Sequence, residues 1–294
     1  MVTDVIKISE KDKNMDKICI SADSTFDMTP EMAEHYEIKV IPSYVRMDET
    51  DYFDYPDIEQ EALFEYYSQT KKLPQTVAAN PMEYEKFFIE CLAGHDSVVH
   101  IAKSAWMSCC YENAMIAAQK LKNVYVVDST TISGGSALLT LEAVKQKEFL
   151  DAIDLQEHLF DFREKISGSF IVETVEYLHE GGRCSTLTYF GASAMQIKPS
   201  IIIRDGRLTV GKKYMGSYRR CLRDYIESTL LSLEENERDI LVVAHAIQDE
   251  VLLNFALEQI ERKQYFKEIY KMKIGAAVAC HGGPNVFGVF LIKK

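Results

Sequence analysis

The sequence of 294 residues contains no run of about 18 consecutive apolar residues, the length that a membrane-spanning helix requires. Residues 1–16 alternate charged and apolar side chains and therefore lack the apolar core of a signal peptide. The seven cysteines are an odd number and include no C-x-x-C pair, which is typical of reduced thiols rather than of a disulfide framework. We therefore expect a cytoplasmic protein without a membrane span.

Positive charge is also scarce. The 33 Lys and Arg residues are outnumbered by 45 Asp and Glu residues, which gives a formal net charge of −12. Nucleic-acid binding rests on Lys and Arg contacts with phosphate groups, and anionic lipid surfaces attract the same residues. The composition therefore disfavours a nucleic-acid partner. If the ligand is an anion, the cationic groups that hold it must be few and local.

The first half of the chain alternates strand-like and helix-like segments. Strands separated by helices of this length favour a mostly parallel α/β sheet with right-handed crossovers. The expected strands span 17–23, 38–45, 97–102 and 123–128, and the expected helices span 30–36, 81–93, 108–121, 136–148 and 155–166. At 294 residues the chain is long enough for a second domain.

The second half mixes strand pairs with helices, which favours an α+β domain with a largely antiparallel sheet. Its clearest signal is Asp205-Gly206, a dipeptide typical of a short hairpin turn. Strand pairs are expected in 168–174 and 199–213, the latter around this turn, and further strands over 239–246, 268–275 and 286–294. The expected helices span 218–235 and 250–263. We therefore predict an α/β domain over residues 1–167 and an α+β domain over residues 168–294.

Five polar segments stand where an expected strand ends or an expected helix begins. Open α/β sheets bind ligands at the carboxyl ends of their strands, and the free N–H groups at a helix start attract anions. The segments span 22–27, 74–81, 103–110, 176–185 and 280–288. Turn formation and helix capping would explain the same residue types, so a ligand site and a purely structural role both stay open for each segment.

Single residues in these segments have two interpretations each. Thr76 is the only hydroxyl residue of an expected loop, and Ser108 is well placed to cap a helix. Arg183 follows two glycines that allow a helix to stop, and a lone arginine is more often part of a surface salt bridge than of a site. His281 lies in an expected tight turn beside two glycines and Pro284, which favours it over the other histidines as a ligand contact.

Catalysis is an alternative to binding. An acyl hydrolase or transferase would use Ser108 or Cys109 as its nucleophile with His281 as the base. However, no Gly-x-Ser-x-Gly elbow surrounds Ser108, and the sequence does not identify a cation or a base beside Cys109 and Cys110. Both absences count against a hydrolase or transferase.

Taken in order, the polar segments resemble the DegV family, and the resemblance extends from about Lys17 to the C-terminus. It rests on Asp-Ser-Thr-x-Asp at 23–27, VVDSTTISGGS at 126–136, VETVEYLHEGGRCS at 172–185, IKPSI at 197–201 and His-x-Gly-Pro at 281–284. The resemblance implies a two-domain bacterial protein that binds one long-chain fatty acid between its domains, with the tail buried and the carboxylate near the surface.

The same resemblance implies the partners of the protein. They are a fatty acid and the catalytic subunit of a separate fatty acid kinase, which phosphorylates the bound acid for phospholipid synthesis. The protein itself would be a non-catalytic acyl carrier without a metal or a cofactor. A lipid-sensing regulatory protein, whose partner reads the lipid-bound state, is a further alternative.

Three residues hold the carboxylate by this resemblance: Thr76, Ser108 and His281. The accessory candidates are Ser104, Cys109 and Arg183. The segments around Thr76 and Ser108 depart from the family pattern and carry fewer hydroxyl residues than it does. The candidates for contact with the fatty acid tail, which core packing would explain equally well, are Phe87, Phe88, Leu187, Tyr189, Phe190 and Met195.

Overall fold

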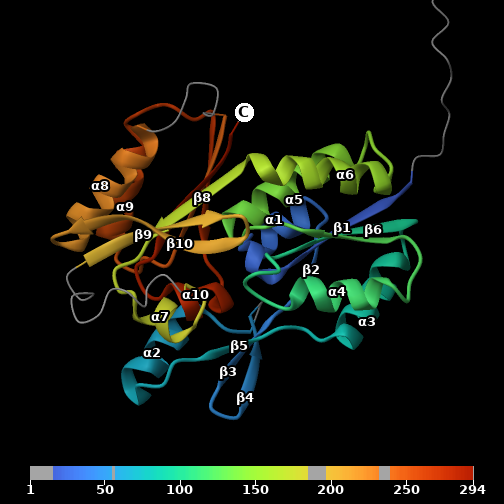
Figure 1. The fold of residues 1–294 in the computed structure, drawn as a ribbon, viewed down its shortest axis with the longest axis horizontal. Helices are drawn as coiled ribbons and strands as arrows, with labels where there is room; N and C mark the ends of the chain where they lie inside the picture. Colours follow the sequence, from blue (N-terminus) through green and yellow to red (C-terminus); the bar gives the residue numbers. More distant parts are fainter. Residues whose placement is uncertain (1–15, 55–56, 185–196, 232–238, 294) are drawn as a thin grey trace, which may run out of the picture.

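The computed structural model describes residues 16–54, 57–184, 197–231 and 239–293. Figure 1 shows two main sheets side by side, with helices around them and a smaller sheet below. The first main sheet has the strand order β2-β1-β6-β7 and is parallel throughout, which confirms the predicted α/β class. Its strands are β1 (Ile18–Asp23), β2 (Lys39–Ile41), β6 (Ser97–Ala102) and β7 (Val124–Asp128).

Five helices accompany this sheet, and their starts follow from the sequence. They are α1 (Pro30–His35), α3 (Pro81–Leu92), α4 (Cys110–Ala118), α5 (Gly134–Gln146) and α6 (Ala152–Phe162). Thr29 caps α1 through its side chain, and Asn80 forms a capping box with Glu83 at α3. Both caps precede a proline at the first helical position, where the missing N–H costs no hydrogen bond.

The second main sheet has the order β10-β9-β8-β13-β11-β12, and all its pairs are antiparallel except β11 with β12. Its strands are β8 (Ile166–Ile171), β9 (Ile197–Arg204), β10 (Arg207–Met215), β11 (Ile240–His245), β12 (Glu268–Lys273) and β13 (Phe287–Ile292). The helices of this half are α7 (Glu176–Glu180), α8 (Tyr218–Leu231), α9 (Glu250–Glu261) and α10 (Ala276–Gly282). The predicted α+β class is confirmed. The proposed domain division at residue 167 falls within β8.

The predicted hairpin turn at Asp205 and Gly206 joins β9 to β10. Both residues have positive φ, 49° and 77° respectively, as a tight turn of this kind requires. The strands pair from Arg204 and Arg207 onward, with a bulge between Val210 and Lys213.

A third, three-stranded sheet was not predicted. It has the order β4-β3-β5 and consists of β3 (Tyr44–Met47), β4 (Thr50–Phe53) and β5 (Gln75–Val77). The helix α2 (Gln60–Thr70), which precedes β5, was not predicted either. The single strand expected over 38–45 is wrong, because the chain leaves the parallel sheet after Ile41 and joins the small sheet at Tyr44. Pro42, which lacks an amide proton, lies at this break.

The helix α5 lies between the two main sheets. It contacts β1 and β6 of the first and β8, β11 and β13 of the second. Its start must come close to the second sheet, because a side chain at Gly134 would meet both Phe290 and Val242 at 2.6 Å. The absence of a side chain at Gly134, within the motif at 126–136, thus allows the two sheets to share one helix.

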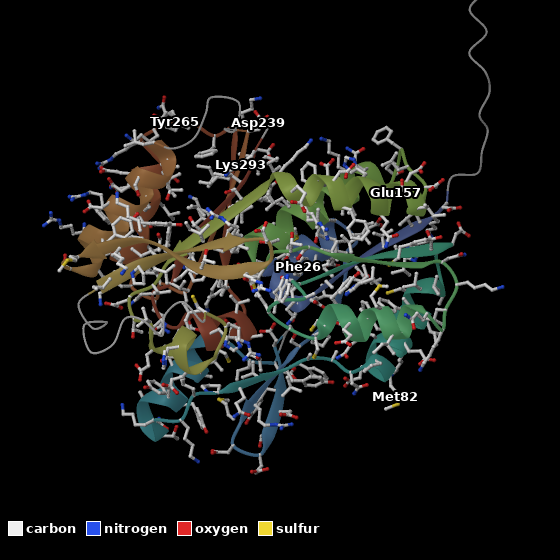
Figure 2. The ribbon with its side chains drawn as sticks, viewed as in Figure 1. Phe26, Met82, Glu157, Asp239, Tyr265 and Lys293 are labelled. Atoms are coloured by element: carbon white, nitrogen blue, oxygen red, sulfur yellow. The ribbon has the colours of Figure 1, made fainter. Side chains whose placement is uncertain are left out.

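The sheet faces are divided between two apolar clusters. Along β11, Leu241 and Val243 pack with α8 and α9, whereas Val242 and Ala244 belong to the cluster between the sheets. Figure 2 places Phe26 within the side chains between the sheets and Met82 at the outer edge of α3. Within the described ranges, no helix is long and apolar enough to cross a membrane.

Candidate functional site

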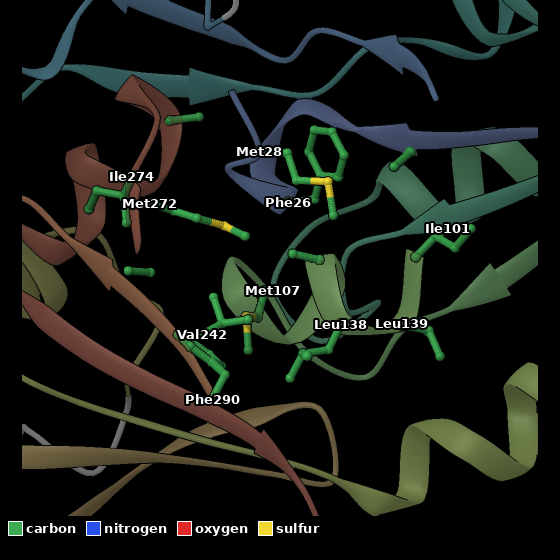
Figure 3. Close-up of a cluster of buried hydrophobic side chains, with 14 of the residues drawn as sticks. Phe26, Met28, Ile101, Met107, Leu138, Leu139, Val242, Met272, Ile274 and Phe290 are labelled. Atoms are coloured by element: carbon green, nitrogen blue, oxygen red, sulfur yellow. The ribbon is translucent and has the colours of Figure 1, made fainter. Parts of the chain in front are cut away.

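An apolar cavity lies where α10 and β5 approach the two main sheets. The empty volume of the cavity is about 1020 Å³, which includes the solvent at its opening. Residues from both halves of the chain line it. Met107, Ile274 and Phe290 are among the apolar residues of this wall, and Figure 3 shows Met107 and Phe290 within the cluster between the sheets. A cavity with this lining suits an apolar ligand.

Thr76 and His281 meet at one end of the cavity. Thr76 Oγ1 lies 2.9 Å from His281 Nε2, although the two residues are 205 positions apart in the sequence. Thr76 lies on β5, opposite Val45 of β3, and His281 lies in the last turn of α10. The loop expected at Thr76 and the turn expected at His281 are therefore wrong. The turn begins only at Gly283, which has a φ of 77°.

Ser108, the third predicted carboxylate ligand, lines the same cavity just before α4. Its Oγ accepts a hydrogen bond from the Cys110 amide at 3.3 Å and donates to Cys110 Sγ at 3.2 Å. The helix begins two residues later than expected, but the Ser108 hydroxyl still satisfies an amide at its start. We call Thr76, Ser108 and His281 the head-group cradle.

A second hollow, more polar than the cavity, lies beside the cradle, and we call it the outer hollow. Its polar lining comes from the end of α2, from β5 and from α7, and consists of Tyr67, Lys71, Gln75, Glu176 and Glu180. Thr76, His281 and Arg183 line both the outer hollow and the apolar cavity. These three residues therefore stand between a polar space and an apolar one, where the polar end of an amphipathic ligand would lie.

His281 is held in its neutral form. Burial, together with the nearby positive charges of Arg183 and Lys103, lowers the pKa of His281 to about 3. Its Nδ1 is buried and has no hydrogen-bond partner among the described residues, and it faces Gly181, where a side chain would approach this nitrogen to 2.4 Å. A neutral imidazole at this position can exchange hydrogen bonds with Thr76 and a ligand, but it contributes no net charge.

Replacing His281 should change how stability depends on pH. The pKa of His281 falls from an ordinary 6.5 in the unfolded chain to about 3 in the folded protein, so the unfolded state binds the extra proton between these values. Lowering the pH through this window therefore favours unfolding of the wild type. We expect the stability advantage of the wild type over His281→Gln to shrink from pH 6.5 towards pH 3 in urea denaturation. Parallel pH profiles would contradict this expectation.

The start of α10 is fixed by two buried carboxylates. The Gly275 amide donates to Asp27 Oδ1 at 2.8 Å, and the Ala277 amide donates to Asp54 Oδ1 at 2.6 Å. Asp54 Oδ2 accepts a further hydrogen bond from Ser24 Oγ at 2.6 Å. Burial raises the pKa of both carboxyl groups. Asp27 and Asp54 thus hold the helix that carries His281 one turn further on.

Lys103 is a wall residue of the cavity that sequence reasoning missed. Its side chain is buried, and its Nζ donates to Ser43 Oγ at 2.9 Å. Burial alone would lower the pKa of Lys103, but Cys110, Asp23 and Asp54 outweigh it and raise the pKa above its ordinary value. The sequence feature that could have identified Lys103 is its position directly after the buried strand β6, in the same polar segment as Ser108.

The geometry does not support a nucleophile and base pair in the cradle. Ser108 Oγ bonds to Cys110, and His281 Nε2 bonds to Thr76, so neither Ser108 nor Cys109 has His281 as a hydrogen-bond partner in the described part of the chain. Ser21, His100 and Asp23 do form a chain of contacts of 3.1 and 3.5 Å, but the Ser21 side chain is fully buried. Among the described residues, no group of His, Cys, Asp and Glu side chains could hold a metal ion.

Comparison with known proteins decides the family. The model of the family described as "Uncharacterised protein, DegV family" matches residues 17–294. The chain belongs to the DegV family. A DegV domain-containing protein of Clostridium perfringens is 28% identical over 283 residues, which cover 95% of this chain and 100% of that protein.

Two solved structures have the same fold as this DegV-family chain. A DegV family protein of Thermus thermophilus, described as binding fatty acid, has a TM-score of 0.86 at 22% identity and covers 95% of this chain and 100% of its own. A protein of Eubacterium ventriosum, described as binding stearic acid, has a TM-score of 0.83 at 23% identity, with coverage of 94% and 98%. These similarities confirm the predicted two-domain fold.

The other candidate residues of this DegV-family chain lie in different places. Cys109 and Arg183 line the apolar cavity, whereas Ser104 is not among the residues of its wall. Instead, Ser104 Oγ donates to the Gly206 carbonyl at 2.7 Å, which ties the segment before α4 to the β9–β10 turn. Arg183 Nη1 donates to the Gly181 carbonyl at 2.7 Å, and its side chain is exposed.

Two of the residues expected to contact the tail, Phe87 and Phe88, lie in the described part of this DegV-family chain, and neither lines the cavity. Phe88 is fully buried on α3 and packs against Tyr84 and His100, and Phe87 packs beside it. The remaining candidates, which lie outside the described residues, are Leu187, Tyr189, Phe190 and Met195. The cavity wall comes instead from β8, β11, β13 and α10, whose apolar residues the sequence could not distinguish from ordinary core.

Proposed function

We propose that this DegV-family protein binds one long-chain fatty acid, with its tail in the apolar cavity and its carboxylate at the head-group cradle. The observation that carries the proposal is the charge of the cavity wall. Among the described residues that line it, Lys103 and Arg183 are cationic and none is acidic, although the whole chain has a formal charge of −12. An acidic protein that lines one apolar cavity with cationic and hydroxyl groups is suited to an amphipathic anion.

The tail supplies most of the affinity in this proposal. Burying a methylene group stabilises a complex by about 0.8 kcal/mol, so a chain of about 14 methylenes gains roughly 11 kcal/mol before the costs of ordering. The cradle then orients the carboxylate through the hydroxyls of Thr76 and Ser108 and the ring of His281. Fatty acids named in the descriptions of similar structures, such as stearic acid, support this ligand class.

Removing the Thr76 hydroxyl should weaken fatty-acid binding without changing the fold. Thr76→Val keeps the shape of the side chain but removes the hydrogen bond to His281 and the bond proposed to the carboxylate. We expect the Kd for palmitic acid, measured by calorimetry on delipidated protein, to rise about tenfold.

A matched control is Thr209→Val, which removes a strand hydroxyl bonded to the Ile202 carbonyl and away from the cavity. We expect this control to bind palmitic acid as the wild type does. Equal affinities for Thr76→Val and the wild type would remove Thr76 from the cradle.

We further propose that the bound acid is presented to a separate fatty acid kinase, with the protein itself acting as a non-catalytic carrier in the cytoplasm. The position of the cradle beside the outer hollow supports this role, since a partner would reach the carboxylate there without displacing the tail. The experiment is a reaction with ATP, the loaded protein and a candidate kinase. Acyl phosphate should form only when both proteins are present. Turnover by the carrier alone that disappears in Ser108→Ala or Cys109→Ala would instead establish the hydrolase or transferase alternative.

A further inference from the structure

The head-group cradle has no positive charge of its own. Thr76 and Ser108 are neutral, and the pKa of His281 is lowered to about 3, so its ring is neutral at physiological pH. A carboxylate that leaves water needs hydrogen bonds and, where it is buried, a compensating charge. Arg183 also lines the cavity and acts on His281, but its side chain is exposed, so solvent and salt screen its charge. A buried counter-charge therefore requires a second, buried cation in the wall.

Lys103 is a buried cation in this wall. Its exposed fraction is 7%, and it is placed by two contacts: its amide donates to Asp23 Oδ2 and its Nζ donates to Ser43 Oγ, both at 2.9 Å. An ammonium group has three donor protons, of which Ser43 accepts one and the Cys110 side chain a second. The side chain is therefore held in position with donor capacity to spare.

The acids near Lys103 have partners of their own. Asp23 also accepts from the Tyr84 hydroxyl and lies 3.5 Å from His100, and Asp54 accepts from Ser24 and the Ala277 amide. These carboxylates stabilise the charged form of Lys103 and raise its pKa, but they do not line the cavity.

The charge of Lys103 reaches the cradle. Lys103 lines the same cavity as Thr76, Ser108 and His281, and burial, Arg183 and Lys103, in this order of effect, lower the pKa of His281. The same positive charges that disfavour a proton on His281 would stabilise an anion bound beside it. Lys103 is therefore positioned to favour a negative charge in the cradle, even though His281 supplies none.

We propose that Lys103 selects the charge of the ligand: its ammonium group favours an ionised carboxylate in the cradle over a neutral head group on the same acyl chain. The inference rests on the proposed function and adds to it a basis for distinguishing free fatty acids from fatty alcohols and fatty-acid esters. Chain burial is the same for all of these ligands, so Lys103 would decide between them.

The test compares palmitic acid with hexadecanol, by calorimetry on delipidated protein. Lys103→Met keeps most of the side-chain length and removes the charge. We expect it to weaken palmitic acid binding about tenfold or more while changing hexadecanol binding by less than about twofold. Lys103→Arg should restore most of the preference. The control is Lys86→Met, which removes an equal charge from the exposed face of α3.

The outcomes separate this inference from the proposed function. An equal loss of affinity for both ligands in Lys103→Met, or no loss for either, would overturn the role of Lys103. If Lys103→Met does not fold, the wild type alone decides: equal affinities for palmitic acid and hexadecanol would overturn the inference while leaving a lipid-binding cavity. Failure of the wild type to bind either ligand would instead overturn the proposed function.

Discussion

Asp54→Ala should lower the free energy of unfolding by roughly 3 kcal/mol and weaken ligand binding as well. The substitution leaves the Ser24 hydroxyl and the Ala277 amide without their buried acceptor, and each unsatisfied group costs about 1–3 kcal/mol. It also releases the start of α10, so that His281 is no longer held at the cavity. Urea denaturation and calorimetry with palmitic acid measure the two effects.

Two further variants test the cause of this loss. Asp54→Asn keeps an oxygen that can accept from Ala277, so we expect a smaller loss of stability than in Asp54→Ala. Asp51→Ala removes an exposed carboxylate of the same strand region, which pairs with Arg46 at the surface. We expect little change there, because such pairs contribute little. A similar loss in Asp51→Ala and Asp54→Ala would contradict the role assigned to Asp54.

Ala244→Phe should abolish binding of long-chain fatty acids while the protein stays folded. Ala244 lies on the face of β11 that lines the cavity. A phenyl ring at this position would fill part of the space in which we propose that the tail binds. If about five methylenes lose their burial, the complex loses roughly 4 kcal/mol, or close to a thousandfold in affinity. Binding of palmitic acid and a thermal unfolding curve measure the two parts of this expectation.

The matched control is Ile240→Phe, which adds an aromatic ring on the same face of the same strand. Ile240 packs against the cluster between the sheets but does not line the cavity. We expect it to bind palmitic acid nearly as the wild type does. Wild-type affinity in Ala244→Phe would show that the tail does not occupy this cavity.

The sequence predicted the elements that have strong local signals. The helices expected over 30–36 and 81–93 begin at Pro30 and Pro81, where the structure shows a capping residue before each proline, and Asp205-Gly206 marked the hairpin. These predictions succeed because caps and tight turns depend on residues adjacent in the chain. The parallel and antiparallel classes of the two main sheets followed from the order of these elements.

The small sheet and α10 were missed because their stability comes from distant contacts. Thr76 was assigned to a loop, since the three residues of β5 form a strand only by pairing with β3. Likewise, α10 is a short helix among small residues, and its start depends on Asp27 and Asp54, which lie more than 200 positions away. No local pattern encodes such contacts.

The candidate site was predictable only in part. The resemblance to the DegV family named Thr76, Ser108 and His281, and the structure brings Thr76 and His281 into contact and places all three on one cavity. Lys103 was not found, because a lysine beside a buried strand usually lies at the surface. The sequence also could not tell cavity from core: Phe88 is as apolar as Phe290, and only the packing of the two sheets shows that Phe290 lines the cavity and Phe88 does not.

The central claim is that the protein carries a single long-chain fatty acid, and native mass spectrometry of the purified protein tests it most directly. We predict a mass above that of the chain by one long-chain fatty acid, which organic extraction removes and added palmitic or oleic acid restores in a ratio of one per chain. A protein that carries no fatty acid as purified, and takes up none when either acid is added, would contradict the claim.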